Sequence, residues 1–399
     1  MKVFVFDLMP YARHFDEFKA ERLIPYPLPG RHFDPEIAAR TYADSIALWK
    51  EMDRLGFDGV GLNEHHTTVH GMMNAPNMMA AVGAQHTERL KFLQLGNLIP
   101  LHNPLRIAEE IAMADCMSRG RLLAGFARGN QREYGVFQVK MSESRARFEE
   151  AFEIILKAWT EEVFSYEGKF WSFKDIAIWP RPYQQPHPPI WIPFTGSKET
   201  IDWAAKYDLG AVLPTFSRGV TRDMVGYFAK SLAAHGRAIR PDQIGLLTDA
   251  WVADSQDAAL AENGPYFLYF NQTLWHHGSL AGIREPNRGG YVTATSYDYI
   301  KPENRASAGM DREKIRRTEL KDIEERVRSG HLAWGSPKEV ADHLIELGEH
   351  AGANVLVVNL NLGAVPGELM LEQVRRFGRD VLPRLHAHEV TRVPAAAMA

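Results

Sequence analysis

The stretch with the most reactive side chains is a run of four polar residues that directly follows an apolar segment. Residues 57–62 read Phe-Asp-Gly-Val-Gly-Leu, and Asn63, Glu64, His65 and His66 come next. Imidazoles titrate near neutral pH, so this pair could hold or move a proton beside a bound ligand. The abrupt change to polar residues is typical of a buried strand that ends at a functional rim. Because adjacent strand residues point to opposite faces, at most one of the two histidines is expected to face that ligand.

The same residues allow two other interpretations. A rim histidine held only by hydrogen bonds fits as well, and glutamate and histidine are also metal ligands. Barrel metallohydrolases usually present a His-x-His pair at the end of strand 1, and this sequence has none there. Its only such pair is His386 and His388, in the tail after the last expected helix. We therefore expect no metal at this rim.

Two later strand ends carry residue types that bind phosphate. Residues 127–130 read Ala-Arg-Gly-Asn, where the guanidinium is a planar multidentate donor and the glycine lets the backbone approach closely. Residues 195–200 read Thr-Gly-Ser-Lys-Glu-Thr and offer hydroxyls and N–H groups at a helix start. The alternatives are an ion pair between Arg128 and Glu133, and an ordinary helix cap. With His65 and His66, the two clusters predict a phosphate-bearing cofactor whose reactive ring reaches the histidines.

The elements that position these clusters alternate between strand and helix along the chain. Eight such strands predict a (β/α)8 barrel, in which all three clusters would meet at the carboxyl-terminal rim. The expected strands are 1–8, 57–63, 90–99, 121–127, 189–194, 211–213, 244–252 and 355–361. Helices are expected from Pro35 to a cap at Gly56, over 105–117 and over 144–161, with a hairpin over 163–173.

Two long segments interrupt this alternation. Residues 9–34 form a proline-rich connection after the first strand, and residues 264–334 are too many for one crossover. The second segment contains a charged run, 310–328, expected as one helix, and we interpret the whole of 264–334 as a lid over the rim. The expected organisation is a single barrel domain, 1–390, with a short tail, 391–399.

The composition excludes several classes of protein. The 399 residues include 46 basic and 50 acidic side chains, a net charge of −4, which does not favour nucleic-acid binding. The single cysteine, Cys116, cannot form an intramolecular disulfide and fits a reducing compartment. No segment has the ~18 uninterrupted apolar residues of a membrane span, and the first residues do not read as a signal peptide. We expect a cytoplasmic protein.

Several stretches, in order along nearly the whole chain, resemble the bacterial-luciferase-like flavin-dependent monooxygenase family. They are 55–58 (Leu-Gly-Phe-Asp), 64–66 (Glu-His-His), 103–106 (Asn-Pro-Leu-Arg), 115–121 (Asp-Cys-Met-Ser-Arg-Gly-Arg), 127–129 (Ala-Arg-Gly), 134–137 (Tyr-Gly-Val-Phe), 143–145 (Glu-Ser-Arg) and 335–340 (Gly-Ser-Pro-Lys-Glu-Val).

The resemblance implies a two-component monooxygenase on a TIM barrel. Such an enzyme binds FMNH2 from a separate NAD(P)H:flavin reductase, forms a C4a-(hydro)peroxyflavin and inserts one oxygen atom of O2 into a small organic substrate. The family's catalytic histidine matches His65, and Glu64 and His66 are its candidate catalytic neighbours. The phosphate arginine matches Arg128, and the phosphate hydroxyls match Ser197 and Thr200. The full set of implied cofactor-binding residues is Asn63, Leu95, Gly96, Asn97, Arg128, Gly129, Thr195, Gly196, Ser197 and Thr200.

The chain departs from luciferases at two positions that bear on its chemistry. Gly196 stands where luciferases carry a carboxylate, and Ala127 where some carry a reactive cysteine, which argues against light emission. Two alternatives stay open: an F420-dependent hydride-transferring oxidoreductase, and a non-catalytic flavin-binding partner subunit. Family members commonly pair through barrel helices, so a homodimer is expected. Candidate substrate contacts are Arg13, Phe15, Tyr26, Tyr269 and Trp275.

Overall fold

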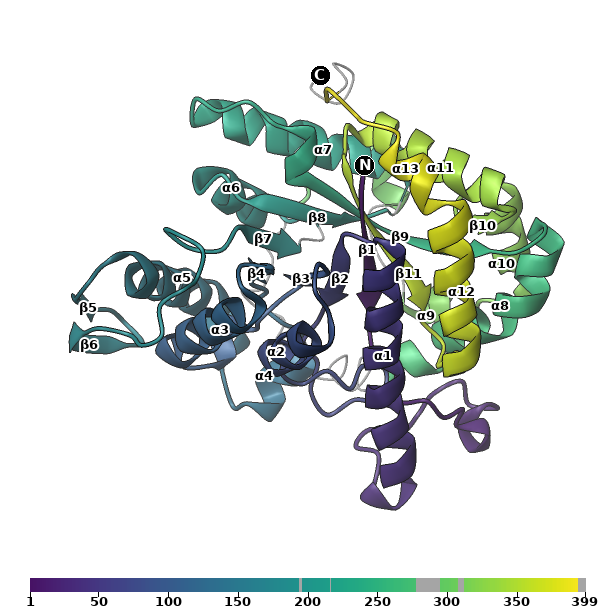
Figure 1. Ribbon diagram of the computed structural model, residues 1–399, viewed down its shortest axis with the longest axis horizontal. Coiled ribbons are helices and arrows are strands. Elements are labelled where there is room, and N and C mark those ends of the chain that lie inside the picture. Colours follow the sequence, from purple (N-terminus) through teal and green to yellow (C-terminus); the bar gives the residue numbers. More distant parts are fainter. Residues whose placement is uncertain (194–195, 216, 278–294, 308–311, 394–399) are drawn as a thin grey trace.

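Eight parallel strands close into a barrel in the computed structural model, which describes residues 1–193, 196–215, 217–277, 295–307 and 312–393 (Figure 1). The sheet order β9-β11-β1-β2-β3-β4-β7-β8 returns to β9, because β8 also pairs with β9. This confirms the predicted (β/α)8 barrel. The strands are β1 (Lys2–Asp7), β2 (Gly59–Leu62), β3 (Lys91–Gln94), β4 (Leu122–Gly125), β7 (Ile190–Pro193), β8 (Gly210–Pro214), β9 (Ile244–Val252) and β11 (Val355–Asn361).

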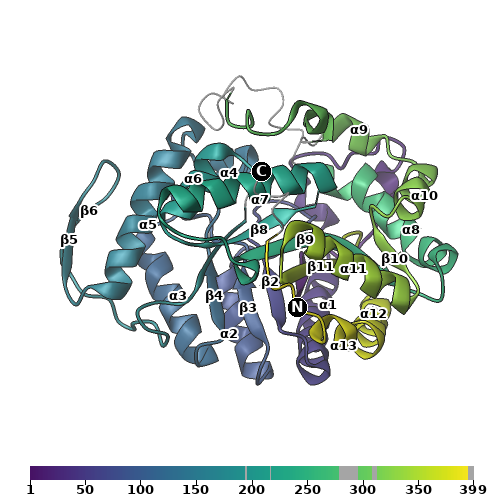
Figure 2. The ribbon, with the colours of Figure 1, turned by 90° about the horizontal axis from the view of Figure 1, so that it is seen from above.

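Helices surround this barrel, as the view from above shows (Figure 2). The long ones are α1 (Pro35–Leu55), α2 (Pro76–His86), α3 (Pro104–Ser118), α5 (Ser144–Thr160), α6 (Lys198–Lys206), α7 (Arg218–Ala234), α8 (Gln256–Gln272), α11 (Pro337–Ala351) and α12 (Gly367–Asp380). Short helices are α4 (Gln131–Val136), α9 (Arg312–Arg316), α10 (Leu320–Arg328) and α13 (Leu382–His386). None of the helices in the described ranges is long and apolar enough to cross a membrane.

The first helix shows how the sequence sets an element's ends. Asp34 caps α1 by accepting a hydrogen bond from the backbone N–H of Glu36, and Pro35 takes the first helical position. Gly56 ends the helix with φ of 89°, a left-handed conformation that favours glycine. Both predicted boundaries are therefore confirmed.

Large side chains fill the barrel interior where the facing strand carries a glycine. Phe4 and Trp191 belong to an internal cluster with Leu93, Val212, Val355 and Val357. A Cβ added at Gly59 would lie 2.5 Å from the Phe4 ring, and one at Gly210 would lie 2.5 Å from Trp191. The glycines therefore make room for the aromatic rings, and the barrel is a packed core rather than a pore.

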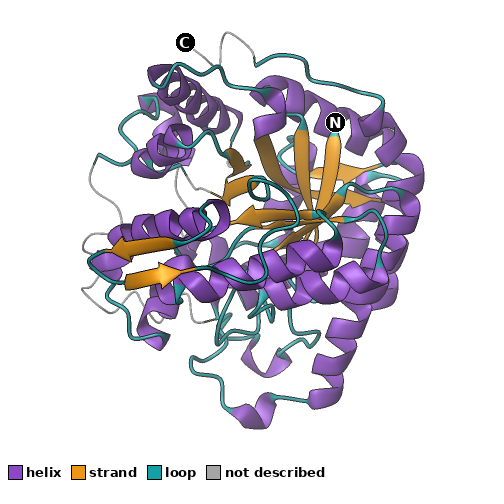
Figure 3. Ribbon diagram, turned by 60° about the vertical axis from the view of Figure 1, so that its left-hand side comes forward, coloured by secondary structure: helices purple, strands orange, loops and turns teal. Residues whose placement is uncertain are grey.

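Outside the barrel, some predicted elements have different bounds. The hairpin is present as β5 (Phe164–Glu167) and β6 (Ser172–Ile176), a separate antiparallel pair on the outside of the molecule (Figure 3). The single helix predicted over 310–328 is wrong, because the described part divides into α9 and α10. Glu319 begins the second helix with its own capping box. The barrel sheet has one further strand, β10 (Ala333–Gly335), which pairs with β9 outside the closed ring of eight.

Candidate active site

A cavity opens beyond the carboxyl ends of β2, β3, β4 and β7, and it collects the strand-end clusters that the sequence singled out. The lining comes from loops after these strands and from the starts of α4, α5 and α6. Its residues are Glu64, His65, Leu95, Gly96, Leu98, Phe126, Ala127, Arg128, Gly129, Asn130, Glu133, Arg145, Phe148, Ile192, Pro193, Ser197, Thr200, Trp203 and Tyr297.

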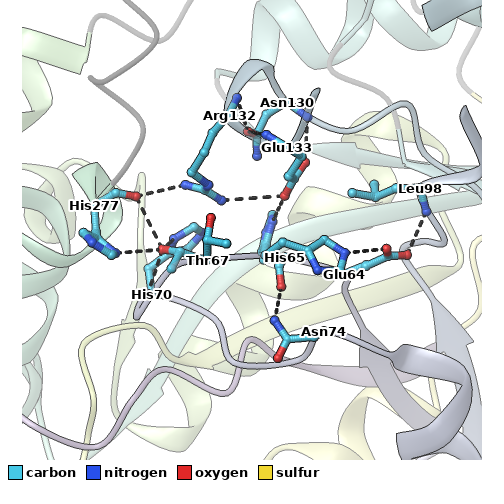
Figure 4. Close-up of polar contacts among 12 residues, drawn as sticks. Glu64, His65, Thr67, His70, Asn74, Leu98, Asn130, Arg132, Glu133 and His277 are labelled. Carbon is cyan, nitrogen blue, oxygen red and sulfur yellow. Dashed lines mark hydrogen bonds and ion pairs between the residues drawn. The ribbon is translucent and has the colours of Figure 1, made fainter. Parts of the chain in front are cut away.

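His65 is held at this cavity by a buried carboxylate. Its Nδ1 donates a hydrogen bond of 3.0 Å to Oε1 of Glu133, whose side chain is 1% exposed. The other oxygen of Glu133 accepts from the backbone N–H of Asn130 at 2.8 Å (Figure 4). Because the carboxylate binds the proton on Nδ1, a neutral His65 presents Nε2 as an acceptor. The residue can therefore take and return a proton at a fixed position.

Glu64, His66 and His102 form a second cluster; the two histidines line a second cavity, and Glu64 lines both. Nε2 of His66 and Nε2 of His102 both donate to Oε1 of Glu64, at 2.7 and 2.6 Å, and Oε2 accepts from the backbone N–H of Leu98. Burial alone would raise the pKa of Glu64, but the hydrogen bonds from His102 and His66 outweigh it and lower the pKa to about 2. The cluster fixes a charged carboxylate directly beside His65.

This cluster also has the composition of a metal site. One ligand atom each from Glu64, His66 and His102 lie within 4.8 Å of one another, the only such group among the described residues. In the structure, the two histidines already satisfy one oxygen of the carboxylate. These hydrogen bonds hold the three side chains together.

Two arginines and two hydroxyls form a strongly basic end of the first cavity. Nη2 of Arg145 donates to Oγ1 of Thr200 at 3.2 Å, and Oγ of Ser197 donates to the same oxygen at 2.9 Å. Burial lowers the pKa of Arg145, and the nearby Arg128 lowers it further. Two neighbouring guanidinium groups beside a helix start favour a bound dianion such as a phosphate.

Close backbone packing shapes the floor of this cavity. A Cβ at Gly96 would lie 2.6 Å from the backbone of Gly125, and Gly129 adopts φ of 81°. Phe126 and Leu98, both buried, add apolar surface to the lining that also contains His65 and the arginines. An apolar floor with a basic end fits a cofactor that joins a flat ring to a phosphate, such as FMN.

The structure brings together most, but not all, of the predicted cofactor residues. Leu95, Gly96, Arg128, Gly129, Ser197 and Thr200 line the first cavity. Asn97 lines the second cavity with His66. Asn63 is buried, and no described residue hydrogen-bonds its side-chain amide. Gly196 does not line the cavity and accepts a hydrogen bond from the Tyr299 hydroxyl. Thr195 lies outside the described residues.

The predicted substrate contacts lie away from the lining of the first cavity. Arg13 pairs with Glu17 at 2.7 Å, so its charge is already neutralised. Phe15 is buried, and its backbone N–H donates to the Tyr269 hydroxyl. Tyr26 shares a hydrogen bond with Thr67, and the Trp275 ring packs against His276.

Sequence reasoning missed two important partners, Glu133 as the carboxylate of His65 and Arg145 as a second cation. The sequence suggests Glu133 only as an ion-pair partner of Arg128. The spacing of Asn130 and Glu133 is that of a capping box, which marks a helix start immediately after β4. That signal could have placed Glu133 at the rim, whereas nothing local indicates that it would reach His65 across 68 positions.

The fold and this cavity define a barrel enzyme with a place for a phosphate-bearing molecule. The family model for luciferase-like monooxygenases matches residues 26–354, so the chain belongs to this family of flavin-dependent monooxygenases. This confirms the family resemblance that the sequence motifs predicted.

Individual relatives match less of the chain. Over 173 residues it is 39% identical to protein y4wF of Sinorhizobium fredii, a match that spans 43% of this chain and about half (50%) of that protein. Over 265 residues it is 29% identical to the oxygenase component of the flavin-dependent trigonelline monooxygenase of Acinetobacter baylyi, covering 64% of this chain and 71% of that protein.

Solved structures agree on the fold. The monooxygenase RslO1 of Streptomyces bottropensis is 23% identical with a TM-score of 0.72, over 97% of this chain and 100% of that one. The oxygenating constituent of 3,6-diketocamphane monooxygenase of Pseudomonas putida, solved with FMN, is 16% identical with a TM-score of 0.72, over 96% and 98%. At these identities the likeness establishes the barrel alone.

Proposed function

We propose that the protein is the oxygenase of a two-component monooxygenase, which uses reduced FMN to insert one oxygen atom of O2 into a small organic substrate. The observation that carries this proposal is that one cavity joins a carboxylate-held histidine to a two-arginine anion site. Family membership supports it, as does the trigonelline relative, named as an oxygenase component. A separate NAD(P)H:flavin reductase would then supply the reduced cofactor.

The residues of the cavity have distinct roles in this proposal. Arg128, Arg145 and the hydroxyls of Ser197 and Thr200 hold the FMN phosphate, and the glycine-lined floor at Gly96 supports the ring. Reduced FMN, when bound, supplies the electrons that activate O2. His65, oriented by Glu133, takes and returns a proton at Nε2, and the charged Glu64 lines the same cavity.

Anaerobic binding of reduced FMN, followed by an oxygen pulse, tests this proposal. We expect oxidised FMN to return more slowly with the protein than in buffer. We expect Arg128→Ala to weaken binding of reduced FMN by about 1–3 kcal/mol, the scale of charge-assisted hydrogen bonds. Arg54→Ala is the control, because Arg54 is exposed and pairs with Glu51 on α1. Failure to bind reduced FMN, together with binding of F420, would replace the proposal with the hydride-transfer alternative.

We also infer that a second copy of the chain covers the outer face of α2 and α3. Met78 and Val82 are one helical turn apart on α2, and Met113 and Met117 are one turn apart on α3. Their exposed fractions are 67%, 36%, 48% and 41%. The two helices lie side by side (Figures 1 and 2), so their side chains form one apolar patch of the kind that marks protein interfaces.

A further inference from the structure

One buried cation near His65 has hydrogen-bonding capacity that the described residues do not use. The side chain of Arg132, in the first turn of α4, is 2% exposed. Its Nη1 donates to the backbone carbonyl of His277 at 2.9 Å. Its Nε and Nη2 have no hydrogen-bond acceptor among the described residues. A guanidinium stays charged when buried, and leaving its donors without acceptors disfavours the folded state.

The neighbouring carboxylate does not fill this need. Oε1 of Glu133 lies 3.6 Å from Nη2 of Arg132, beyond hydrogen-bond distance, and it already accepts from His65. Oε2 of Glu133 accepts from the backbone of Asn130. Both oxygens of Glu133 therefore accept hydrogen bonds from other groups, and its contact with Nη2 of Arg132 is an ion pair without a hydrogen bond.

The two unused nitrogens form the edge of a guanidinium that grips a carboxylate. Nε–H and the adjacent Nη2–H point in parallel, and a carboxylate matches them with its two oxygens. The same edge of Arg54 binds the carboxylate of Glu51 at 2.9 and 2.8 Å in this structure. The corresponding edge of Arg379 binds Asp380. In Arg132 the edge is buried, and no carboxylate among the described residues hydrogen-bonds to its two nitrogens.

Imidazole and phenol side chains lie around Arg132, so an organic anion bound there would meet flat rings. The rings of His277 and Tyr26 lie 5.7 Å apart in an edge-to-face arrangement, and the rings of His65 and His70 are 4.7 Å apart. Figure 4 shows Arg132, His277, His70 and Thr67 grouped beside His65. Nδ1 of His277 accepts from the backbone N–H of Val69, so a neutral His277 carries its proton on Nε2.

We infer that Arg132 is the substrate-recognition residue and that the substrate is a small ring-bearing carboxylate, bound through the Nε and Nη2 edge of Arg132 beside His65. This inference rests on the proposed function and specifies its substrate class. It also separates two anion sites by position: Arg128 and Arg145 hold the cofactor phosphate, whereas Arg132 holds the substrate.

Benzoate and benzamide test this assignment, because they share size and shape and differ in charge. Each is titrated by calorimetry into protein loaded with FMN, in the wild type, Arg132→Met and Arg132→Lys. We expect the wild type to bind benzoate about ten- to a hundredfold more tightly than benzamide. Arg132→Met should abolish this preference, and Arg132→Lys should retain only part of it, because an ammonium lacks the parallel edge.

The affinity for FMN provides the internal control. We expect it to change less than about threefold in both Arg132 variants and in the presence of benzoate. Arg22→Met, at an exposed ion pair with Glu319, should keep the preference for benzoate. Absence of benzoate binding, equal binding of the two probes, an unchanged preference in Arg132→Met, or displacement of FMN by benzoate would each overturn the assignment. Loss of FMN binding by the wild type would instead contradict the proposed cofactor.

Discussion

At the scale of single residues, the site depends on which partner each charged group has. His65 and His66 are neighbours, yet they belong to different clusters, because one bonds to Glu133 and the other to Glu64. Glu133 orients the histidine that lines the first cavity, whereas Glu64 accepts hydrogen bonds from two other histidines, His66 and His102. The proton chemistry that we propose therefore belongs to His65 alone.

Removing His65 or its carboxylate should alter the flavin reaction without releasing the flavin. In His65→Ala, oxidised FMN should return about 10²-fold faster after an oxygen pulse, because the positioned proton donor and acceptor is lost. Glu133→Gln should have a smaller effect in the same direction, and both should keep FMN affinity. His386→Ala, at an exposed histidine that pairs with Asp58, is the control. A return as slow as in the wild type would exclude His65 from this role.

Burial of His277 should make folding stability depend on acid pH. Burial lowers the pKa of His277, and the nearby Arg132 lowers it further, to about 4. Between pH 6.5 and 4 the unfolded chain binds a proton at this residue that the folded chain excludes. The free energy of unfolding should therefore fall as pH falls through this window, by about 3 kcal/mol at most, and be unaffected above pH 6.5.

Urea unfolding at a series of pH values measures this dependence. His277→Gln should show a shallower loss of stability between pH 6.5 and 4 than the wild type. His235→Gln, at an exposed position after α7, should leave the slope unchanged. An identical slope in His277→Gln and the wild type would show that His277 does not titrate differently in the two states.

At the scale of elements, the short helix α4 connects the proposed flavin cavity to the proposed substrate residue. Asn130 and Glu133 close its first turn as a capping box, and the same turn carries Arg132. Glu133 therefore has a local task at the helix start and a distant one at His65. Fixing this turn fixes the relative positions of the histidine, its carboxylate and the buried arginine.

Loss of the α4 cap should impair chemistry, whereas loss of an equivalent cap elsewhere should not. Asn130→Ala and Ser336→Ala each remove a capping box and should each cost about 1 kcal/mol of stability. In an oxygen pulse, we expect only Asn130→Ala to speed the return of oxidised FMN, because only α4 carries Glu133. Asn130→Ser, which can still cap, should restore most of the slow return. Equal behaviour of the two alanine variants would contradict this.

At the scale of the whole molecule, barrel closure places the clusters at one rim and leaves the helices outside. The loops after β2, β4 and β7 reach one cavity because parallel strands all end at the same side. On the outside, α2 and α3 present apolar side chains directly behind Glu64 and His66. A second copy on this face would also bury the Glu64 cluster.

Charged residues on this face should separate the proposed dimer. The wild type should have the mass of two chains in light scattering, and the double variant Met113→Glu, Met117→Glu the mass of one, because buried like charges disfavour association. Val163→Glu is the control, since Val163 is 60% exposed near the outer hairpin. A monomeric wild type, or a dimeric double variant, would rule out this interface.

The sequence by itself determined the barrel and the main strand-end clusters. Alternating apolar runs and helix signals such as Pro35 and Gly56 are local features, because backbone geometry and side-chain periodicity act over a few residues. The position of Arg128 at the end of β4, and of Ser197 after β7, follows from the strands that precede them. Closure of parallel strands then requires these residues to share a rim.

Only the tertiary structure decided which groups pair. Among the described residues, Glu133 hydrogen-bonds to His65. His66 and His102 both hydrogen-bond to Glu64 at the second cavity. The unused edge of Arg132 likewise appears only once its neighbours are in place. Pairing of charged groups depends on distances of a few ångströms between residues far apart in the chain, and local sequence patterns carry no such information.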